Sequence, residues 1–294
     1  MPKTLQIVRK GVIMSEYEKT GYLKEDFRYF HIAAKDPLEY SYHYHDFHKV
    51  LFFLSGDVTY HVEGRSFDLL PQDLVLIPAG EIHRPSAKST ATYERIILYL
   101  SPSYLSSLTD GSASLSLCLE RARSQGSNVL RVPSAYRNRI SAIFSQLEKE
   151  IHAQKADQGF FAGDLYQHIL VQEFLILLNR ASLSRQSIYL PNSCKNEKIL
   201  QILDYIARHL SDPLCIDQIA GEFFMSRYHL MHLFKESTGY TVGNYITIKR
   251  LLYARSLIQK GTPVTQACYL CGFQNYSTFS RAYKKHFHTT ARSD

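Results

Sequence analysis

The chain has 294 residues, 45% of them hydrophobic and 13% aromatic, and its 34 Lys and Arg residues outnumber its 27 Asp and Glu residues to give a net charge of +7. This length allows about two domains with apolar cores, and the composition excludes a disulfide mini-scaffold, a low-complexity chain and a collagen-like fibre. The first residues lack the pattern of a signal peptide, and no apolar run approaches the roughly 18 residues of a membrane span. We therefore expect a cytoplasmic protein without a membrane partner.

The first part of the chain is predicted to be rich in β-strands, from about Phe27 to Leu100. Short runs such as Val50 to Leu54 and Val58 to Val62 contain many β-branched and aromatic residues, and turn-forming residues separate them. Many short strands with closely spaced turns favour a small barrel or jelly roll. Residues 1–110 are accordingly predicted to form one domain with an N-terminal arm.

Helical periodicity follows in residues 111–184. Ile140, Phe144 and Leu147 recur at helical spacing, and a second, broader apolar face begins at Leu165. Two interpretations remain equally open for these helices, a core packed on the barrel and a contact between subunits. Polar, turn-forming residues then predict a linker over 185–195.

Residues 196–294 are predicted to be helical throughout and carry +5 of the net charge of +7. A short helix, a tight break and a second helix occur twice, and one long helix connects the two copies. The predicted helices span Ile216 to Phe223, Ser226 to Thr238, Val242 to Gln259, Val264 to Cys271 and Asn275 to Phe287. This pattern indicates a duplicated helix-turn-helix, and the basic excess favours a polyanionic partner.

The second helix of each copy has one apolar face and one polar face, as a helix in the major groove requires. The polar face is expected to bind double-stranded DNA, with cations on phosphates and polar tips on base edges. In the first copy the predicted DNA-binding residues are Arg227, Tyr228, Met231, His232 and Lys235. In the second copy they are Tyr276, Ser277, Ser280, Arg281, Lys284 and Lys285.

The same region resembles the C-terminal domain of the AraC/XylS family of bacterial transcription regulators. The resemblance rests on the order and spacing of Ile219-Ala220, Met225-Ser226, Leu233-Phe234-Lys235, Thr238-Gly239, Arg250-Leu251, Gly272-Phe273 and Phe279-Ser280-Arg281. It implies two helix-turn-helix units that read successive major-groove segments, and a structural role for Arg250. It also places Cys268 and Cys271 at core positions. This agrees with the sequence, because a zinc site would need a second pair of ligands and no such pair lies near these two cysteines.

The chain departs from this family pattern near its end. His288 stands where the family commonly has Gly, which adopts a left-handed conformation without steric cost. We therefore expect the second unit to lack a terminal helix and to be less stable.

Two short motifs in the first domain resemble those of a cupin barrel. They are His43-Tyr44-His45 and Pro78-Ala79-Gly80-Glu81-Ile82-His83. In a metal cupin a Glu follows the first two His, whereas this chain has Lys49, and an ammonium group beside three imidazoles disfavours a metal ion. Strand alternation sends the adjacent His48 to the opposite face of the sheet. The predicted fold class is thus α+β, with a cupin-like β-barrel, a helical middle segment and an all-α double helix-turn-helix.

The resemblance to regulators suggests that the barrel is a sensor for a small molecule. His43, His45, Lys49 and His83 are the predicted effector-binding residues, and Lys49 favours an anionic or polyhydroxyl effector. We predict a one-component transcription regulator without catalytic residues, metal or cofactor, which forms a homodimer and has RNA polymerase as a further partner. The alternatives are a cupin-type metal enzyme fused to a DNA-binding domain and a stress regulator without a small-molecule ligand.

Overall fold

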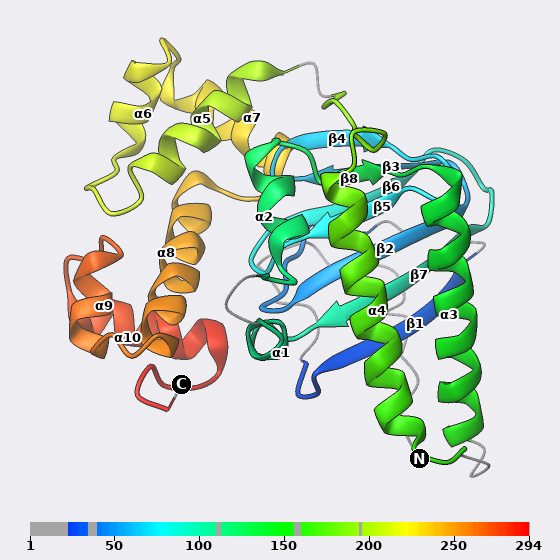
Figure 1. Ribbon diagram of the computed structural model, residues 1–294. Coiled ribbons are helices and arrows are strands. Elements are labelled where there is room, and N and C mark those ends of the chain that lie inside the picture. Colours follow the sequence, from blue (N-terminus) through cyan, green and yellow to red (C-terminus); the bar gives the residue numbers. More distant parts are fainter. Residues whose placement is uncertain (1–22, 35–39, 110–112, 156–159, 194–195, 294) are drawn as a thin grey trace.

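The computed structural model describes residues 23–34, 40–109, 113–155, 160–193 and 196–293 (Figure 1). The N-terminal arm predicted from Met1 to about Thr20 lies outside these residues. Strands dominate the first hundred residues and helices dominate the last hundred, so the predicted α+β class is confirmed. Within the described residues, no helix is both long and apolar enough to cross a bilayer.

The strands form two antiparallel sheets. Six strands pair in the order β1-β7-β2-β5-β8-β9, and three pair in the order β4-β3-β6. Their bounds are β1 Phe27–Ala34, β2 His48–Ser55, β3 Val58–Val62, β4 Arg65–Asp68, β5 Leu74–Ile77, β6 His83–Ala87, β7 Tyr93–Leu100, β8 Val129–Arg131 and β9 Ile188–Tyr189. The strand content and short turns are those predicted, but the two sheets face each other without closing into one hydrogen-bonded barrel among the described residues.

Strands β8 and β9 extend the large sheet from outside the predicted β region. β8 pairs with β5 and β9 pairs with β8, although sequence patterning predicted helix around the first and linker around the second. Runs of two and three residues are too short to show a strand period, and tertiary pairing alone places them in the sheet.

Two apolar layers hold this domain together. Aromatic side chains such as Phe53, Tyr60 and Phe67 fill the space between the two sheets. The other face of the large sheet is covered by the long helices α3 (Ser134–Lys155) and α4 (Gly163–Leu183), as Figure 1 shows. The shorter helices α1 (Pro102–Ser107) and α2 (Leu117–Ser124) follow β7 and complete the domain. Packing of these helices on the sheet confirms one of the two interpretations that the sequence left open.

The C-terminal domain contains six helices in its described residues. They are α5 Glu197–Arg208, α6 Ile216–Glu222, α7 Arg227–Thr238, α8 Val242–Gln259, α9 Val264–Leu270 and α10 Tyr276–Phe287. Side-chain caps begin both recognition helices, since Ser226 Oγ accepts from the His229 N–H group and Asn275 Oδ1 accepts from the Thr278 N–H group. The duplicated pattern read from the sequence is therefore present, with α8 as the connecting helix.

Candidate effector site and DNA interface

The three predicted histidines meet between the two sheets. His43 pairs with His83 in an isolated β-bridge, and their ring centroids lie 4.4 Å apart. The His45 ring lies 5.1 Å from each of them. One nitrogen from each ring can be chosen so that all three atoms lie within 4.8 Å of one another. Side chains separated by up to forty residues thus form one compact imidazole cluster.

Backbone carbonyl groups fix two of these rings. The Nδ1 atom of His43 lies 2.8 Å from the Ser41 oxygen, and that of His83 lies 2.8 Å from the Glu81 oxygen. Because a carbonyl oxygen only accepts, each Nδ1 carries the proton and each Nε2 is left with a lone pair. Burial lowers the pKa of His43 to about 4 and that of His83 well below its usual value, so both rings are neutral near pH 7.

Lys49 brings an amine to the same cluster. Its Nζ atom lies 3.4 Å from His83 Nε2 and 5.7 Å from the centre of the Tyr60 ring. Burial, followed by the positive charge of Arg95, lowers the pKa of Lys49 to about 7. Imidazole lone pairs can accept from ligand hydroxyl groups, and a protonated Lys49 can bind an anionic or hydroxyl oxygen.

The segment that carries His43 and His45 also contacts the DNA-binding domain through its other side chains. The Tyr42 hydroxyl donates to the Ser237 oxygen at 3.0 Å, and a side chain at Gly239 would collide with the Tyr42 ring. Tyr44 hydrogen-bonds to His286 Nε2, and their rings are stacked. Asp46 pairs with Arg255 at 2.8 Å. The order along the chain therefore alternates between residues that meet the other domain and histidines that meet one another.

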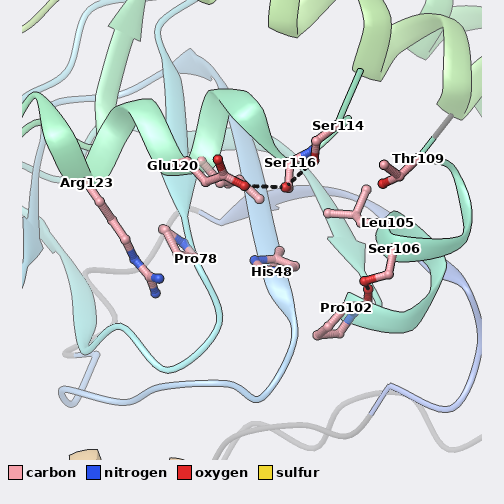
Figure 2. A pocket seen from close by; sticks show the side chains of 11 residues that line it. His48, Pro78, Pro102, Leu105, Ser106, Thr109, Ser114, Ser116, Glu120 and Arg123 are labelled. Carbon is pink, nitrogen blue, oxygen red and sulfur yellow. Dashed lines mark hydrogen bonds between the residues drawn. The ribbon is translucent and has the colours of Figure 1, made fainter. Parts of the chain in front are cut away.

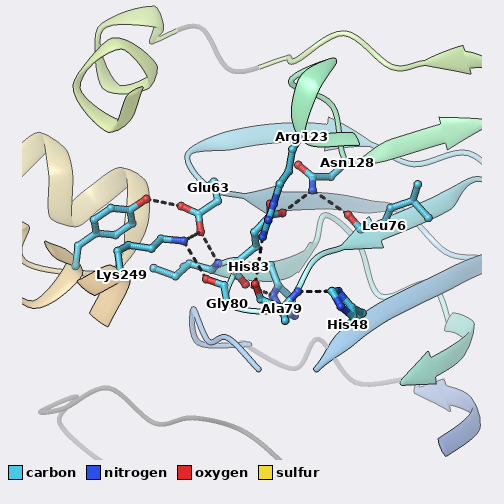
Figure 3. Close-up of polar contacts among 12 residues, drawn as sticks. His48, Glu63, Leu76, Ala79, Gly80, His83, Arg123, Asn128 and Lys249 are labelled. Carbon is cyan, nitrogen blue, oxygen red and sulfur yellow. Dashed lines mark hydrogen bonds and ion pairs between the residues drawn. The ribbon is translucent and has the colours of Figure 1, made fainter. Parts of the chain in front are cut away.

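The motif from Pro78 to His83 and the nearby Glu63 also contact the DNA-binding domain (Figure 3). Glu63 accepts from Lys249 Nζ and from the Tyr245 hydroxyl, each at 2.6 Å, while Lys249 also donates to the Gly80 oxygen at 2.9 Å. Leu252 packs so closely on Gly80 that a Cβ there would lie 2.8 Å from it. Three residues beyond Gly80 the chain reaches His83. Sequence reasoning missed these interdomain residues, because nothing in a single sequence states which surface a polar residue meets.

The first recognition helix presents its predicted polar face to solvent. Leu230 and Phe234 are fully buried, whereas Tyr228 is 79% exposed and Met231 is 41% exposed. Arg227, His232 and Lys235 are exposed as well. Arg227 pairs with Asp217 of α6 at 2.8 Å, which holds its guanidinium at the edge of the unit.

The second recognition helix is equally two-sided. Its buried stripe is Phe279, Tyr283 and Phe287, as predicted. Of the predicted DNA-binding residues in this copy, Ser277, Arg281, Lys284 and Lys285 are exposed, while Tyr276 and Ser280 are half-buried. The exposed cations lie on the same helix as His286, which faces the sensor.

Three other expectations about this domain are met. Arg250 donates to the backbone oxygens of Leu210 and Asp212, at 2.8 Å and 2.6 Å, which is a structural role. Cys268 and Cys271 are fully buried in the core of the second unit. His288 adopts the left-handed conformation with φ 57°, and residues 288–293 form turns with no further helix.

Comparison with known proteins identifies both halves of the chain. The family described as AraC-like ligand binding domain matches residues 29–169, and the family described as helix-turn-helix domain matches residues 219–293. The transcriptional activator RhaS of Shigella sonnei is 24% identical over 251 residues, which are 85% of each chain. This chain belongs to the AraC family of transcription regulators. It therefore combines an N-terminal ligand-binding domain with a DNA-binding helix-turn-helix domain and is an effector-controlled regulator.

A further curated relative and two solved structures are also similar to this AraC-family regulator. The probable transcriptional regulator LumQ of Photobacterium leiognathi is 23% identical over 248 residues, 83% of this chain and 88% of that one. Among solved structures, ToxT from Vibrio cholerae is 16% identical and covers 90% of this chain and 96% of that chain, with a TM-score of 0.34. An AraC-type regulator from Chromobacterium violaceum is 32% identical over 33% of this chain and 88% of that chain, with a TM-score of 0.32.

Proposed function

We propose that this regulator binds operator DNA through α7 and α10 and that an effector held by His43, His45, Lys49 and His83 controls this binding. The proposal rests on the segment from Tyr42 to Asp46, because its side chains contact two different sites. Its histidines face the candidate effector site, and its other residues contact α7, α8 and α10 or the turns beside them. An effector that binds one arrangement of this segment more tightly than another shifts the population of docked DNA-binding domains.

Support for the DNA contacts comes from exposure and charge. Arg281, Lys284 and Lys285 are exposed on one helix that contains no acidic residue, so DNA phosphates can approach without an opposing carboxylate on that helix. On α7, Arg227 and Tyr228 are exposed at the helix start, which is the part of a recognition helix that reaches base edges, and His232 is exposed one turn further along. The remaining predicted residues, Met231, Lys235, Tyr276, Ser277 and Ser280, complete the two proposed surfaces.

A salt titration tests the DNA contacts. DNA from upstream of the gene for this protein is the probe, and random DNA is the competitor. We expect tight binding that survives competition, weaker binding for Arg281→Ala, and for Lys284→Ala a salt slope smaller by about one. Lys198→Ala, an exposed change on α5, is the matched control and should bind as the native protein does. Native affinity and slope in both α10 variants would refute the placement of this helix.

A thermal-shift screen of metabolites tests the effector site. A ligand of the histidine cluster should raise the melting temperature of the native protein and lose this effect in Lys49→Met. If a ligand stabilises both proteins equally, it binds elsewhere. A protein that responds to no metabolite would favour the regulator without a small-molecule ligand, and stoichiometric metal in the purified protein would favour the cupin-type enzyme.

A homodimer is the proposed assembly, because α4 exposes apolar side chains at heptad spacing. Ile169, Ile176 and Leu183 are 48%, 42% and 55% exposed, and Leu165 at the start of the helix is 62% exposed. A stripe of this spacing fits the same stripe on a second copy. Sedimentation should show a dimer for the native protein and a monomer for Ile169→Lys with Ile176→Lys, whereas an unchanged mass would refute this interface.

Two further parts of the proposal follow from DNA binding. A protein that acts on chromosomal operators works in the bacterial cytoplasm, where we place it. When bound beside a promoter it also lies next to RNA polymerase, which is the proposed further protein partner. The units 1–110, 111–184, 185–195 and 196–294 remain the proposed division of labour into sensor, dimerising segment, linker and DNA-binding domain.

A further inference from the structure

A second hollow lies on the other side of β2 from the histidine cluster. It has a volume of about 220 Å³ and opens between β2, α1 and α2 (Figure 2). His48 lines it from the strand, and Arg123 and Glu120 line it from α2. Since His48 and Lys49 are neighbours on one strand, their side chains point to opposite faces of the sheet. This hollow is thus separate from the proposed effector site.

Four of the eleven residues that line this hollow carry hydroxyl groups, and four others are apolar. Ser106, Thr109, Ser114 and Ser116 surround it. The Ser116 hydroxyl donates to Glu120 Oε1 at 2.8 Å and lies 2.7 Å from the Ser114 hydroxyl. Since Ser116 donates its proton to Glu120, Ser114 donates to Ser116, and the network presents acceptor lone pairs to the hollow. The space is smaller than the usual pocket of a drug-sized ligand, which is roughly 300 Å³ or more.

His48 adds a directed donor to these hydroxyls. The Ala79 N–H group donates to His48 Nδ1 at 3.1 Å, so this nitrogen holds a lone pair and the proton sits on Nε2. Burial, and secondarily the charge of Arg123, lowers the pKa of His48 to about 4, so the ring stays neutral near pH 7. The Nε2–H group is therefore a neutral donor on a ring that lines the hollow.

The charges of the lining disfavour an anionic ligand. Arg123 donates through Nε to the buried Glu81 carboxylate at 2.9 Å and through Nη2 to the Ala79 oxygen at 3.2 Å. Its positive charge is thus balanced by Glu81, while the Glu120 carboxylate is the remaining formal charge on the lining. An anion would meet this carboxylate directly, whereas neutral hydroxyl groups can donate to it.

We propose that this hollow binds a small neutral polyhydroxyl molecule, which accepts from His48 Nε2–H and donates to Glu120, and that its occupancy alters docking of the DNA-binding domain. The connection is the loop from Pro78 to Gly80. Ala79 bonds to His48 and to Arg123, and the next residue accepts from Lys249 of α8 (Figure 3). This regulatory part rests on the proposed function, because it acts on the same interdomain contact.

Calorimetric titration with glycerol, erythritol, D-ribose, D-glucose and myo-inositol tests the site, with acetate as the anionic control. We expect at least one polyol to bind the native protein, and we expect no binding of acetate. His48→Phe and Ser116→Leu, which fill the hollow from opposite walls, should each weaken polyol binding roughly tenfold or more. The matched controls are His152→Phe on α3 and Ser124→Leu on α2, both exposed and outside the hollow, and they should bind as the native protein does.

Each remaining outcome decides against part of the proposal. Absence of binding for every polyol, or equal binding of acetate, overturns the ligand class. Binding that persists in His48→Phe and Ser116→Leu but is lost in Lys49→Met assigns the polyol to the histidine cluster and overturns the second site. Unchanged operator affinity with polyol bound overturns the coupling through Ala79, whereas absence of operator binding both with and without polyol contradicts the proposed DNA function instead.

Discussion

Replacement of Lys49 by Met should stabilise the sensor domain, and the gain should depend on pH. The pKa of Lys49 falls from 10.5 to about 7 on folding, because burial and Arg95 disfavour the ammonium form. The unfolded chain therefore binds more protons than the folded one between these values. The resulting cost to folding is largest below pH 7 and disappears as the pH rises through 10.5.

The magnitude follows from the two pKa values. At 1.36 kcal/mol per unit, the cost of burying Lys49 falls by about 2 kcal/mol between pH 7 and pH 9. Met has a similar length and no charge, so the stability advantage of Lys49→Met should shrink by the same amount over this range. For a domain of this size the advantage in melting temperature should shrink by roughly 4–8 °C.

Thermal unfolding of the full chain at pH 7 and pH 9 measures this difference. Lys88→Met is the control, since Lys88 pairs with Asp68 on the surface and is 44% exposed. Its small effect should be the same at both pH values. If Lys49→Met were equally stabilising at both pH values, or more so at pH 9, Lys49 would keep an ordinary pKa. Burial of Lys49 would then not disfavour its ammonium form.

Three further outcomes are expected from the C-terminal domain. Arg250→Ala should lower its stability by about 3 kcal/mol in thermal unfolding, because two carbonyl groups after α5 lose a charged donor, and a loss no larger than that of the exposed Arg208→Ala would contradict this role. His288→Gly should raise its stability by about 1 kcal/mol by removing a left-handed side-chain residue, and destabilisation would show that the imidazole makes a needed contact. In a Cys194→Ser background, thiol titration should find one fast-reacting group, the exposed Cys215, because Cys118, Cys268 and Cys271 are buried, and rapid reaction of a second thiol would contradict their burial.

Periodicity was sufficient to predict most of the C-terminal domain. Its helices alternate buried and exposed faces over many residues, and side chains such as Ser226 and Asn275 cap them locally, so the information lies within each helix. The strands β8 and β9 could not be found this way, because two or three residues have no recognisable period. Their pairing depends on an edge that β5 provides from far away in the chain.

The histidine cluster could be predicted for a different reason. Alternation along an extended segment places His43 and His45 on one face, and resemblance to a two-motif pocket brings His83 to the same place. The same alternation places Tyr42, Tyr44 and Asp46 on the other face, but it does not say what they meet. Only the folded chain shows that Ser237, His286 and Arg255 lie opposite them.

This arrangement limits how the two domains can communicate. His43 and His83 are held together by two backbone hydrogen bonds, of 3.1 Å and 2.8 Å, so their segments move as a pair. A ligand that inserts between the closely spaced imidazole rings pushes on this pair of segments, and each of them contacts the DNA-binding domain directly. Displacement of this pair therefore reaches α8 and α10 without a chain of intermediate residues. Differential affinity of the ligand for the docked and displaced arrangements then sets how far the equilibrium shifts.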